Sequence, residues 1–367
     1  MRLSLYKKYG ERMGNYLEEK GVFHVPGKYD ADPEEGKIWL SHSYPIKAFE
    51  KFLGYYDREE RIAYNPSISF NTDFSYCLAA CEYSKNPGQD RVIMDDSESE
   101  LYSKKADFAL KKFRRDYAIS GSFHFFIRRY RKYSRAKGMS ESSEVAAAVS
   151  KALISCSFNG QADGDGGLQS RYARYVSGSG TRAVFQGISM WLSYPGMDRD
   201  KCIAGKIGES PDKFYYGIFP KDLQSPTDRA HSAAVQSPLY EGWINDKYKF
   251  LNKIVDGDFS PDILFERSSM DMLRLNSVLM SSGIIIQTPE SLKILTKAIQ
   301  FREKNPDFYF TSDTGPSILI ASKSKSLLEE FRENIDDPFI DGSFKYDQHI
   351  NKMKEFKRES EKFFNSL

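Results

Sequence analysis

The stretch SYPIKAFEKFLGYYDREERIAYNPSISFNTD, residues 43–73, decides the fold class, because two apolar segments flank a short charged tract within it. With the preceding KIWL, its first half predicts a short apolar strand, a turn and a second segment that carries Lys51. Its end, SISFNTD, alternates apolar and polar residues as a half-buried strand does. The folded body is therefore predicted to begin with strands.

Strand and helix patterns alternate through the rest of the chain. They predict strands at 90–96 and 120–134, helices at 99–119, 142–158, 237–255, 268–282 and 289–305, and a strand, turn and strand at 308–322. Residues 168–192 predict a helix, a Ser/Gly turn and the start of a second apolar helix, and 345–364 an exposed helix. The helix at 142–158 is rich in alanine, with Ser142 and Ser143 as predicted N-caps. Because strands and helices are interleaved, the predicted class is α+β.

The composition is that of a globular protein without a dominant charge. Hydrophobic residues make up 40% of the 367 residues, and 53 basic side chains face 51 acidic ones. A net charge of +2 creates no overall field that would attract nucleic acid or an anionic membrane. The N-terminus resembles no signal peptide, and no run approaches the ~18 apolar residues of a membrane span. We therefore expect a cytoplasmic protein that meets any anionic ligand with a local cluster.

Neither the cysteines nor the first residues suggest a special site. The four cysteines, Cys77, Cys81, Cys156 and Cys202, lack the density of a disulfide framework and the paired spacing of a zinc site. Cys77 and Cys81 are four residues apart, which on a helix would make them small apolar residues of one face. We expect no metal site, and a loop or irregular extension over residues 1–36.

Small residues surround one arginine in VSGSGTRAVFQG, residues 176–187. Ser and Gly let backbone N–H groups approach an anion, a helix N-terminus adds positive potential, and Arg182 offers a planar fork to carboxylate or phosphate. This pattern predicts an anion-binding turn. A plain helix-capping turn is the more common interpretation of such residues taken alone.

Two further side chains are candidates for chemistry. Asp313 lies between a strand and a turn in YFTSDTGPSILIA, where a carboxylate acts as a general base or caps the turn. Lys51 lies among aromatic residues that would partly desolvate it, although a surface lysine is the common alternative. The alternating aromatic and basic residues 123–133 predict a strand face, an interface or part of a phosphate pocket.

The segment before the alanine-rich helix combines features that favour phosphate binding with features that oppose it. In RAKGMSESSEVAAAVSKAL, residues 135–153, a Gly/Ser turn feeds a helix start, where N–H donors cradle phosphates. Yet Glu141 and Glu144 lie in that turn, and carboxylates beside a polyphosphate are unfavourable unless a cation intervenes.

Taken in order, these motifs resemble the diphosphomevalonate decarboxylases of the GHMP kinase superfamily, over residues 37–345. Lys51 and Gly54 match the family's lysine and glycine, and Asn65, Ser67 and Ser69 match its Asn-Ser-Ser strand. QSPLYEGWI resembles the family's helix that begins Thr-Ser-Pro-Leu, and DMLRLNSVLMSS resembles its later helix.

The remaining motifs carry the family's functional residues. Arg182 falls on its substrate-holding arginine, Ser177 and Ser179 on its substrate-contacting serines, and Asp313 on its catalytic aspartate. The resemblance implies that Arg182 holds the substrate carboxylate or a phosphate and that Lys51 neutralises a leaving phosphate. His231 is expected to donate to that phosphate.

Most departures from the family lie in the residues that would bind a nucleotide. The family's open Ala-Ala-Gly-Leu-Ala-Ser-Ser turn is replaced by 136–144, with its two glutamates. Leu53 replaces a tryptophan, Tyr55 a lysine and Asn276 a histidine. The pattern is most like the archaeal branch that acts on mevalonate 3,5-bisphosphate without ATP.

The resemblance implies a GHMP kinase fold with an N-terminal ribosomal protein S5 domain 2-like lobe at 37–205 and a C-terminal ferredoxin-like lobe at 206–367. It further implies a decarboxylase that forms isopentenyl phosphate, CO2 and phosphate with no cofactor, and a homodimer is one possible assembly. If O3 arrives phosphorylated, Asp313 has no hydroxyl proton to take and would orient Lys51 or destabilise the carboxylate. An ATP- and Mg²⁺-dependent decarboxylase, a mevalonate 3-kinase-type enzyme and a non-catalytic binding protein remain alternatives.

Overall fold

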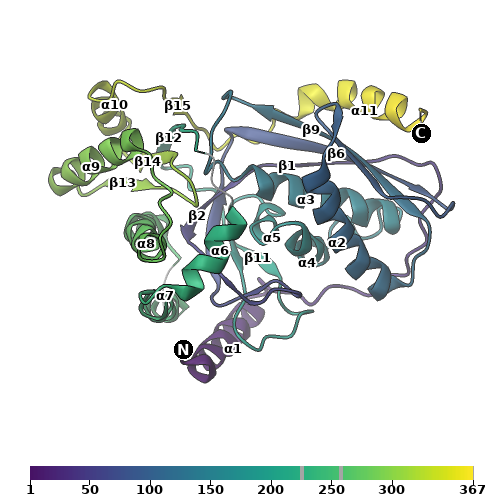
Figure 1. Cartoon of the computed structure of the whole chain (residues 1–367), viewed down its shortest axis with the longest axis horizontal. Helices are drawn as coiled ribbons and strands as arrows, with labels where there is room; N and C mark the ends of the chain where they lie inside the picture. Colours follow the sequence, from purple (N-terminus) through teal and green to yellow (C-terminus); the bar gives the residue numbers. More distant parts are fainter. Residues whose placement is uncertain (224–226, 256–258, 367) are drawn as a thin grey trace.

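The computed structural model describes residues 1–223, 227–255 and 259–366, and its interleaved strands and helices confirm the α+β class (Figure 1). The N-terminal half contains a five-stranded sheet in the order β1-β6-β9-β7-β8. Its strands are antiparallel neighbours except for the parallel pair of β7 and β9. These strands are β1 (Trp39–Ser43), β6 (Ser75–Ser84), β9 (Ser122–Arg131), β7 (Arg91–Met94) and β8 (Ser97–Glu98).

Helices cover both faces of this sheet. One face shares an apolar core with α2 (Glu100–Tyr117), α3 (Glu141–Ser157) and α4 (Gly166–Val176). On the other face lies α11 (Ile350–Phe364), which Figure 1 shows alongside β6 and β9. The prediction of an exposed C-terminal helix is therefore wrong for one side of it, because Phe356 and Phe364 are buried in a cluster with Phe126.

A second sheet, in the order β11-β10-β5-β2, lies next to the predicted site residues. All four strands are antiparallel to their neighbours. A short hairpin of β3 (Tyr55–Asp57) and β4 (Ile62–Ala63) connects β2 to β5. The strands of the sheet are β11 (Ala204–Gly208), β10 (Ile188–Trp191), β5 (Ser67–Asn71) and β2 (Ile46–Glu50). The predicted lobe boundary after residue 205 lies inside β11.

The third sheet belongs to the C-terminal half and has the order β13-β14-β12-β15. Helix α8 joins the halves, because it packs against both β13 and β2. The strands are β13 (Phe308–Thr311), β14 (Ile318–Ser322), β12 (Tyr215–Phe219) and β15 (Ile340–Asp341). The helices of this half are α6 (Thr227–Gln236), α7 (Tyr240–Val255), α8 (Pro261–Ser281), α9 (Pro289–Lys304) and α10 (Lys325–Glu333).

Helix α1 (Leu3–Glu19) occupies a region predicted to be a loop or irregular extension, and that prediction is wrong there. Tyr6 stacks on Tyr248 of α7 at 4.8 Å between ring centroids. The glycines that argue against a helix in the sequence have a packing role, since a Cβ on Gly10 would lie 2.2 Å from Tyr194. Residues 22–36 do lie outside helices and strands.

Two smaller predictions are also corrected. Cys77 and Cys81 lie in β6, not on a helix, although they are buried and free as expected. Helix α3 begins at Glu141 behind Ser140, so the N-caps predicted at Ser142 and Ser143 are wrong. Ser140 has a positive φ of 59°, and its side chain makes no cap bond to the helix.

Candidate active site

Asp313 lies two residues after the end of β13, in the strand-to-turn position that the sequence predicts. Its Oδ1 accepts a hydrogen bond from the backbone N–H of Ala48 at 3.3 Å. Its Oδ2 accepts one from Ser140 Oγ at 2.9 Å and lies 3.5 Å from Lys47 Nζ. These partners come from β2 and from the segment before α3, so Asp313 joins three parts of the chain rather than capping its own turn.

Lys51 is a buried residue and not a surface lysine, with 3% of its surface exposed. Its Nζ donates to Thr311 Oγ1 at 2.8 Å and to the carbonyl of Ala48 at 2.9 Å. Burial lowers the pKa of Lys51 to about 8, although the charges of Asp313 and Asp271 act in the opposite direction. Lys51 therefore loses its proton more readily than an exposed lysine does.

A buried network of charges lies behind Lys51 and holds its backbone. Asp271 of α8 accepts a hydrogen bond from the backbone N–H of Lys51 at 2.8 Å. Asp271 and Glu50 both pair with Lys247 of α7, at 2.7 and 2.6 Å, and all three side chains are fully buried. Arg267 completes the network with a 2.6 Å contact to Glu50. The loop that carries Lys51 is thus fixed to two helices of the C-terminal half.

Arg182 is buried in α5 (Gly180–Ala183), and its Nε and Nη1 have no hydrogen-bond partner among the described residues. The guanidinium lies over the ring of Phe52, 5.6 Å from its centroid. Burial lowers the pKa of Arg182 to about 10, a value at which it still stays charged at neutral pH. A buried cation without a bonded anion is costly, so this geometry favours an anionic ligand over a capping role.

The two serines of the same turn lie beside aromatic side chains. Ser177 Oγ and Ser179 Oγ are 3.0 Å apart, and a Cβ on Gly178 would meet Tyr55 Oη at 2.7 Å. The second apolar helix predicted here is only the single turn α5, because the β-branched and aromatic residues after it form the strand β10. The short turn keeps Arg182 close to the sheet.

Asn65, Ser67 and Ser69 lie beside β2, with side chains that are fully buried. Asn65 Nδ2 donates to the carbonyl of Lys51 at 3.0 Å. Asn65 Oδ1, Ser67 Oγ and Ser69 Oγ have no partner among the residues that the structure describes. Unsatisfied buried polar atoms are rare in proteins, so we expect a bound ligand or water to complete these hydrogen bonds.

His231 of α6 contacts the loop after Lys51. Its Nδ1 accepts a hydrogen bond from the backbone N–H of Gly54 at 2.9 Å. Its ring stacks on Tyr55, with 4.8 Å between centroids and 20° between the planes. Since Nδ1 is the acceptor, the neutral ring carries its proton on Nε2, which suits a donor to an anion.

The segment before α3 is closed against the turn that follows Asp313. A Cβ on Gly315 would lie 2.5 Å from Gly138 N, so the two backbones are in direct contact. Ser317 Oγ donates to the carbonyl of Lys137 at 2.6 Å, and Lys47 Nζ donates to the carbonyl of Gly138. Sequence reasoning missed Lys47, which looks like an outward-facing strand residue.

The two glutamates of α3 have partners of their own. Glu141 pairs with Arg131 at 2.9 Å and with Arg129 at 3.1 Å, and it accepts from Tyr133 Oη at 2.6 Å. The aromatic and basic stretch of β9 therefore binds this internal carboxylate. Glu144 is fully buried, and burial followed by the charge of Glu141 raises its pKa well above 4.5. The start of α3 is occupied by groups of the chain itself.

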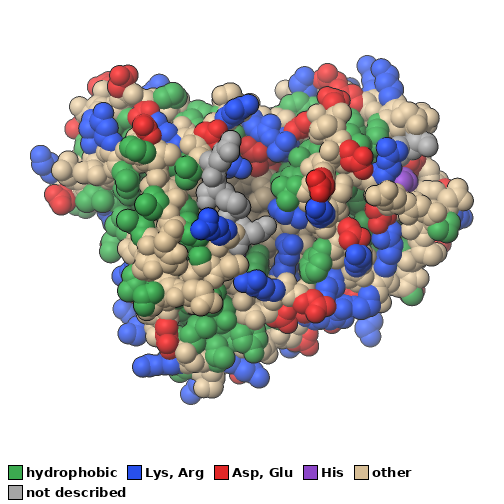
Figure 2. All heavy atoms as spheres, in the orientation of Figure 1, with side chains coloured by type: hydrophobic (Ala, Val, Ile, Leu, Met, Phe, Trp, Pro, Cys, Tyr) green, Lys and Arg blue, Asp and Glu red, His purple; other side chains and the backbone are tan. Residues whose placement is uncertain are grey.

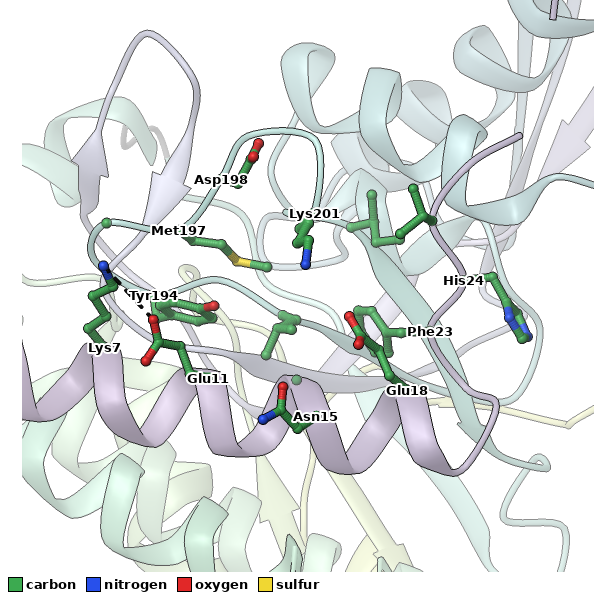
Figure 3. Close-up of a pocket in the computed structure, with 15 residues that line it drawn as sticks. Lys7, Glu11, Asn15, Glu18, Phe23, His24, Tyr194, Met197, Asp198 and Lys201 are labelled. Carbon is green, nitrogen blue, oxygen red and sulfur yellow. Dashed lines mark ion pairs between the residues drawn. The ribbon is translucent and has the colours of Figure 1, made fainter. Parts of the chain in front are cut away.

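Figure 2 shows several lysine and arginine side chains in the middle of one face, near the place where α5 and α6 lie in Figure 1. A separate cavity of about 350 Å³ lies between α1 and the loop after β10. Figure 3 shows Lys7, Glu11, Asp198 and Lys201 around it, and none of the predicted site residues lines it.

The described residues contain no group of three or more His, Cys, Asp or Glu side chains that could hold a metal ion. No helix among them is long and apolar enough to cross a membrane.

The chain is similar to proteins of known activity over nearly its whole length. It is 53% identical over 355 residues to mevalonate 3,5-bisphosphate decarboxylase of Thermoplasma acidophilum, covering 97% of this chain and 88% of that one. It is 50% identical over 364 residues to the Thermoplasma volcanium enzyme of the same name, covering 99% and 98%. Phosphomevalonate decarboxylase of Haloferax volcanii is 24% identical over 287 residues, which cover 76% of this chain and 86% of that one.

A family model and solved structures agree with this likeness. The model of the diphosphomevalonate decarboxylase-like N-terminal domain matches residues 43–204. Mevalonate diphosphate decarboxylases from Enterococcus faecalis and Staphylococcus aureus share the fold with a TM-score of 0.72 at 20% identity. They cover 84% of this chain and 97% and 95% of their own. The predicted fold is confirmed.

Proposed function

This chain belongs to the diphosphomevalonate decarboxylase family, on its mevalonate 3,5-bisphosphate decarboxylase branch, and from this premise we infer that it converts mevalonate 3,5-bisphosphate to isopentenyl phosphate, CO2 and phosphate. The single observation that carries this inference is 50–53% identity to the two Thermoplasma enzymes of that name over nearly the whole chain. It supports this activity over an ATP-dependent decarboxylase or a 3-kinase.

The reaction is an elimination in which atoms and electrons balance without a redox partner. The C3–O bond breaks and its electron pair leaves with the phosphate. The bond between C2 and the carboxyl carbon breaks, and its electron pair forms the C2=C3 double bond while CO2 departs. The enzyme must stabilise the leaving phosphate and keep the carboxylate aligned with the emptying orbital at C3.

Arg182 is the candidate for holding an anionic group of the substrate. Its buried guanidinium offers Nε and Nη1 without a partner among the described residues, so a carboxylate or phosphate would complete its hydrogen bonds. Ser177 and Ser179 on the same turn, and Asn65 and Ser67 on the neighbouring strand edge, are proposed as further contacts to the substrate.

Lys51 and His231 are the candidates for the leaving phosphate. The Lys51 ammonium would offset charge that develops on the departing oxygen, and His231 would donate from Nε2. Lys51 is part of the loop between β2 and β3. His231 contacts the same loop through the backbone N–H of Gly54.

Asp313 would act by charge rather than as a base. With O3 already phosphorylated there is no hydroxyl proton to remove. Asp313 contributes a carboxylate whose charge acts on both Lys51 and Arg182. We propose that it keeps both cations charged and aligned, and that its own charge disfavours the ground-state carboxylate of the substrate.

We also propose that no nucleotide cofactor is used. The residues present do not fit a triphosphate at the start of α3, because Glu141 pairs there with Arg129 and Arg131. Gly138 and Gly315 are in backbone contact beside it, which leaves no room between these segments. The two arginines are already bound to Glu141, and the contact between the segments further opposes phosphate binding.

The test of the activity is identification of the product. The purified chain is incubated with mevalonate 3,5-bisphosphate, and ³¹P NMR follows the organic phosphates. We expect isopentenyl phosphate and inorganic phosphate in equal amounts. Consumption of ATP with mevalonate or its 5-phosphate, and no reaction of the bisphosphate, would instead support a kinase.

Assembly and location complete the proposal. We propose a homodimer in the cytoplasm, supported by the frequent dimers of this fold and by four free, buried thiols that suit a reducing compartment. Light scattering at assay concentration distinguishes a dimer from a monomer, and fractionation of native cells tests the location.

A further inference from the structure

Lys47 is a fully buried lysine in the middle of β2. Its Nζ has two partners, the carbonyl of Gly138 and Asp313 Oδ2, the latter at 3.5 Å. Burying an ammonium group is costly unless its hydrogen bonds and charge are compensated. Burial also lowers the pKa of Lys47, although Asp313 opposes that change. The contacts of Lys47 with Gly138 and Asp313 compensate the cost of its burial.

The two contacts of Lys47 join segments that are far apart in sequence. Gly138 belongs to the segment before α3 and has a φ of +80°, while Asp313 begins the turn before β14. The same two segments meet through Gly138 and Gly315 and through the bond from Ser317 Oγ to the carbonyl of Lys137. We call this contact between residues 137–140 and the turn that follows Asp313 the joint. Lys47 supplies an ammonium group to the joint.

Lys47 is also the cation in direct contact with Asp313. The Oδ2 atom that faces Lys47 accepts the hydrogen bond from Ser140 as well. Lys51 Nζ instead bonds to Thr311 and to a backbone carbonyl. The position of the Asp313 carboxylate therefore depends on β2 and on the closed segment together.

We propose that Lys47 is a positioning residue, which holds residues 137–140 closed on the Asp313 turn and fixes the Asp313 carboxylate for the reaction. This inference rests on the proposed function, because an effect on turnover requires that Asp313 serves the active site. Both partners of the Lys47 ammonium are groups of the chain itself, Gly138 and Asp313, so Lys47 acts through them. Its loss is expected to lower kcat more than it changes KM.

The test compares Lys47→Met with Lys151→Met. Methionine is close to lysine in size and suits a buried site. Lys151 is a matched control, since its Nζ lies 3.4 Å from the carbonyl of His42, outside the candidate site. We expect Lys47→Met to lower kcat on the order of tenfold or more with KM within about threefold. Amide hydrogen exchange at residues 137–141 should become faster in Lys47→Met alone.

Exchange is measured without substrate, so it tests the joint even if the proposed reaction is wrong. Failure of the proposed function appears as an inactive wild-type protein. The inference is overturned if Lys47→Met keeps wild-type kcat and wild-type exchange, or if Lys151→Met loses as much activity. Should circular dichroism show Lys47→Met to be unfolded, Lys47→Gln is assayed in its place with the same expectations.

Discussion

Ser140 Oγ donates a hydrogen bond to Asp313 Oδ2 at 2.9 Å, so the residue that precedes α3 is directly bonded to the candidate catalytic carboxylate. This bond connects the segment before α3, which replaces the family's open phosphate-binding turn, to the turn that carries Asp313. We propose that a segment bonded to Asp313 in this way is closed to a polyphosphate. The closed arrangement and the buried cations around it have consequences that can be measured.

Arg182→Met should abolish most activity while the protein stays folded. Removing a guanidinium that stabilises developing charge lowers kcat by about 10²- to 10³-fold. The thermal midpoint should not fall, because Nε and Nη1 of Arg182 have no partner to lose within the described chain. Activity assays and differential scanning fluorimetry measure the two effects.

Arg174→Met is the matched control for that experiment. Arg174 is also buried, but its Nη1 donates to the carbonyls of Arg199 and Cys202. Its loss removes both of these hydrogen bonds, and the carbonyl of Arg199 keeps only the one from the backbone N–H of Cys202, so the substitution should cost about 1–3 kcal/mol of stability. Equal destabilisation by both substitutions would mean that Arg182 has a structural role and would contradict its assignment to the substrate.

The activity should decline as the pH rises through about 8, the pKa of Lys51. Lys51 must carry its proton to offset the negative charge of the leaving phosphate. Because its pKa is lowered, it loses that proton at a lower pH than an ordinary lysine does. The profile of kcat/KM against pH reports this group in the free enzyme. In Lys51→Arg the alkaline limb should disappear, and an unchanged limb would assign it to another group.

Acid should destabilise the fold through His42. Its ring stacks on His349 of the C-terminal region at 3.6 Å, and burial, then Lys151 and His349, lower its pKa from 6.5 to about 3. Between these values the unfolded state binds the extra proton, so stability falls as the pH drops from 6.5 toward 3. The slope from this group is at most about 1.4 kcal/mol per pH unit.

Urea unfolding at several pH values measures that slope. The variant His42→Phe keeps an aromatic ring but cannot titrate, so its stability should depend less on pH in this window. A variant with the same slope as the wild type would place the acid sensitivity elsewhere.

Gly315→Ala should open the joint between the segment before α3 and the Asp313 turn. A methyl group at this position would lie 2.5 Å from Gly138 N, and backbone at this distance must move. We expect a loss of about 1–3 kcal/mol in stability together with lower kcat. Gly164→Ala is the control, since nothing lies within 4 Å of the place that its added methyl group would occupy. Similar behaviour of both variants would argue against the joint.

The parts of the site whose chemistry is local are predictable from the sequence. Residue type and position identify Asp313 after a strand and Arg182 in a Ser/Gly turn, and the structure places each as expected. Lys47 is not predictable in this way, because a lysine between Ile46 and Ala48 in a strand looks solvent-exposed. Its partner Gly138 is 91 residues away in the sequence and its partner Asp313 lies in the C-terminal half, so only the fold creates these contacts.

The missed elements have similar physical causes. Helix α1 contains Gly10 and Gly14, which oppose a helix locally but allow it to lie against Tyr194 and Leu192. The buried face of α11 was missed because its apolar residues are few, and their burial depends on β6 and β9. In each case a tertiary contact outweighed a local preference.

The most direct measurement is the release of CO2 and phosphate from mevalonate 3,5-bisphosphate by protein freed of nucleotide with apyrase and of Mg²⁺ with EDTA. We expect full turnover, with CO2 and phosphate released in equal amounts, as the elimination requires. Release of CO2 only after ATP and Mg²⁺ are added back would contradict it.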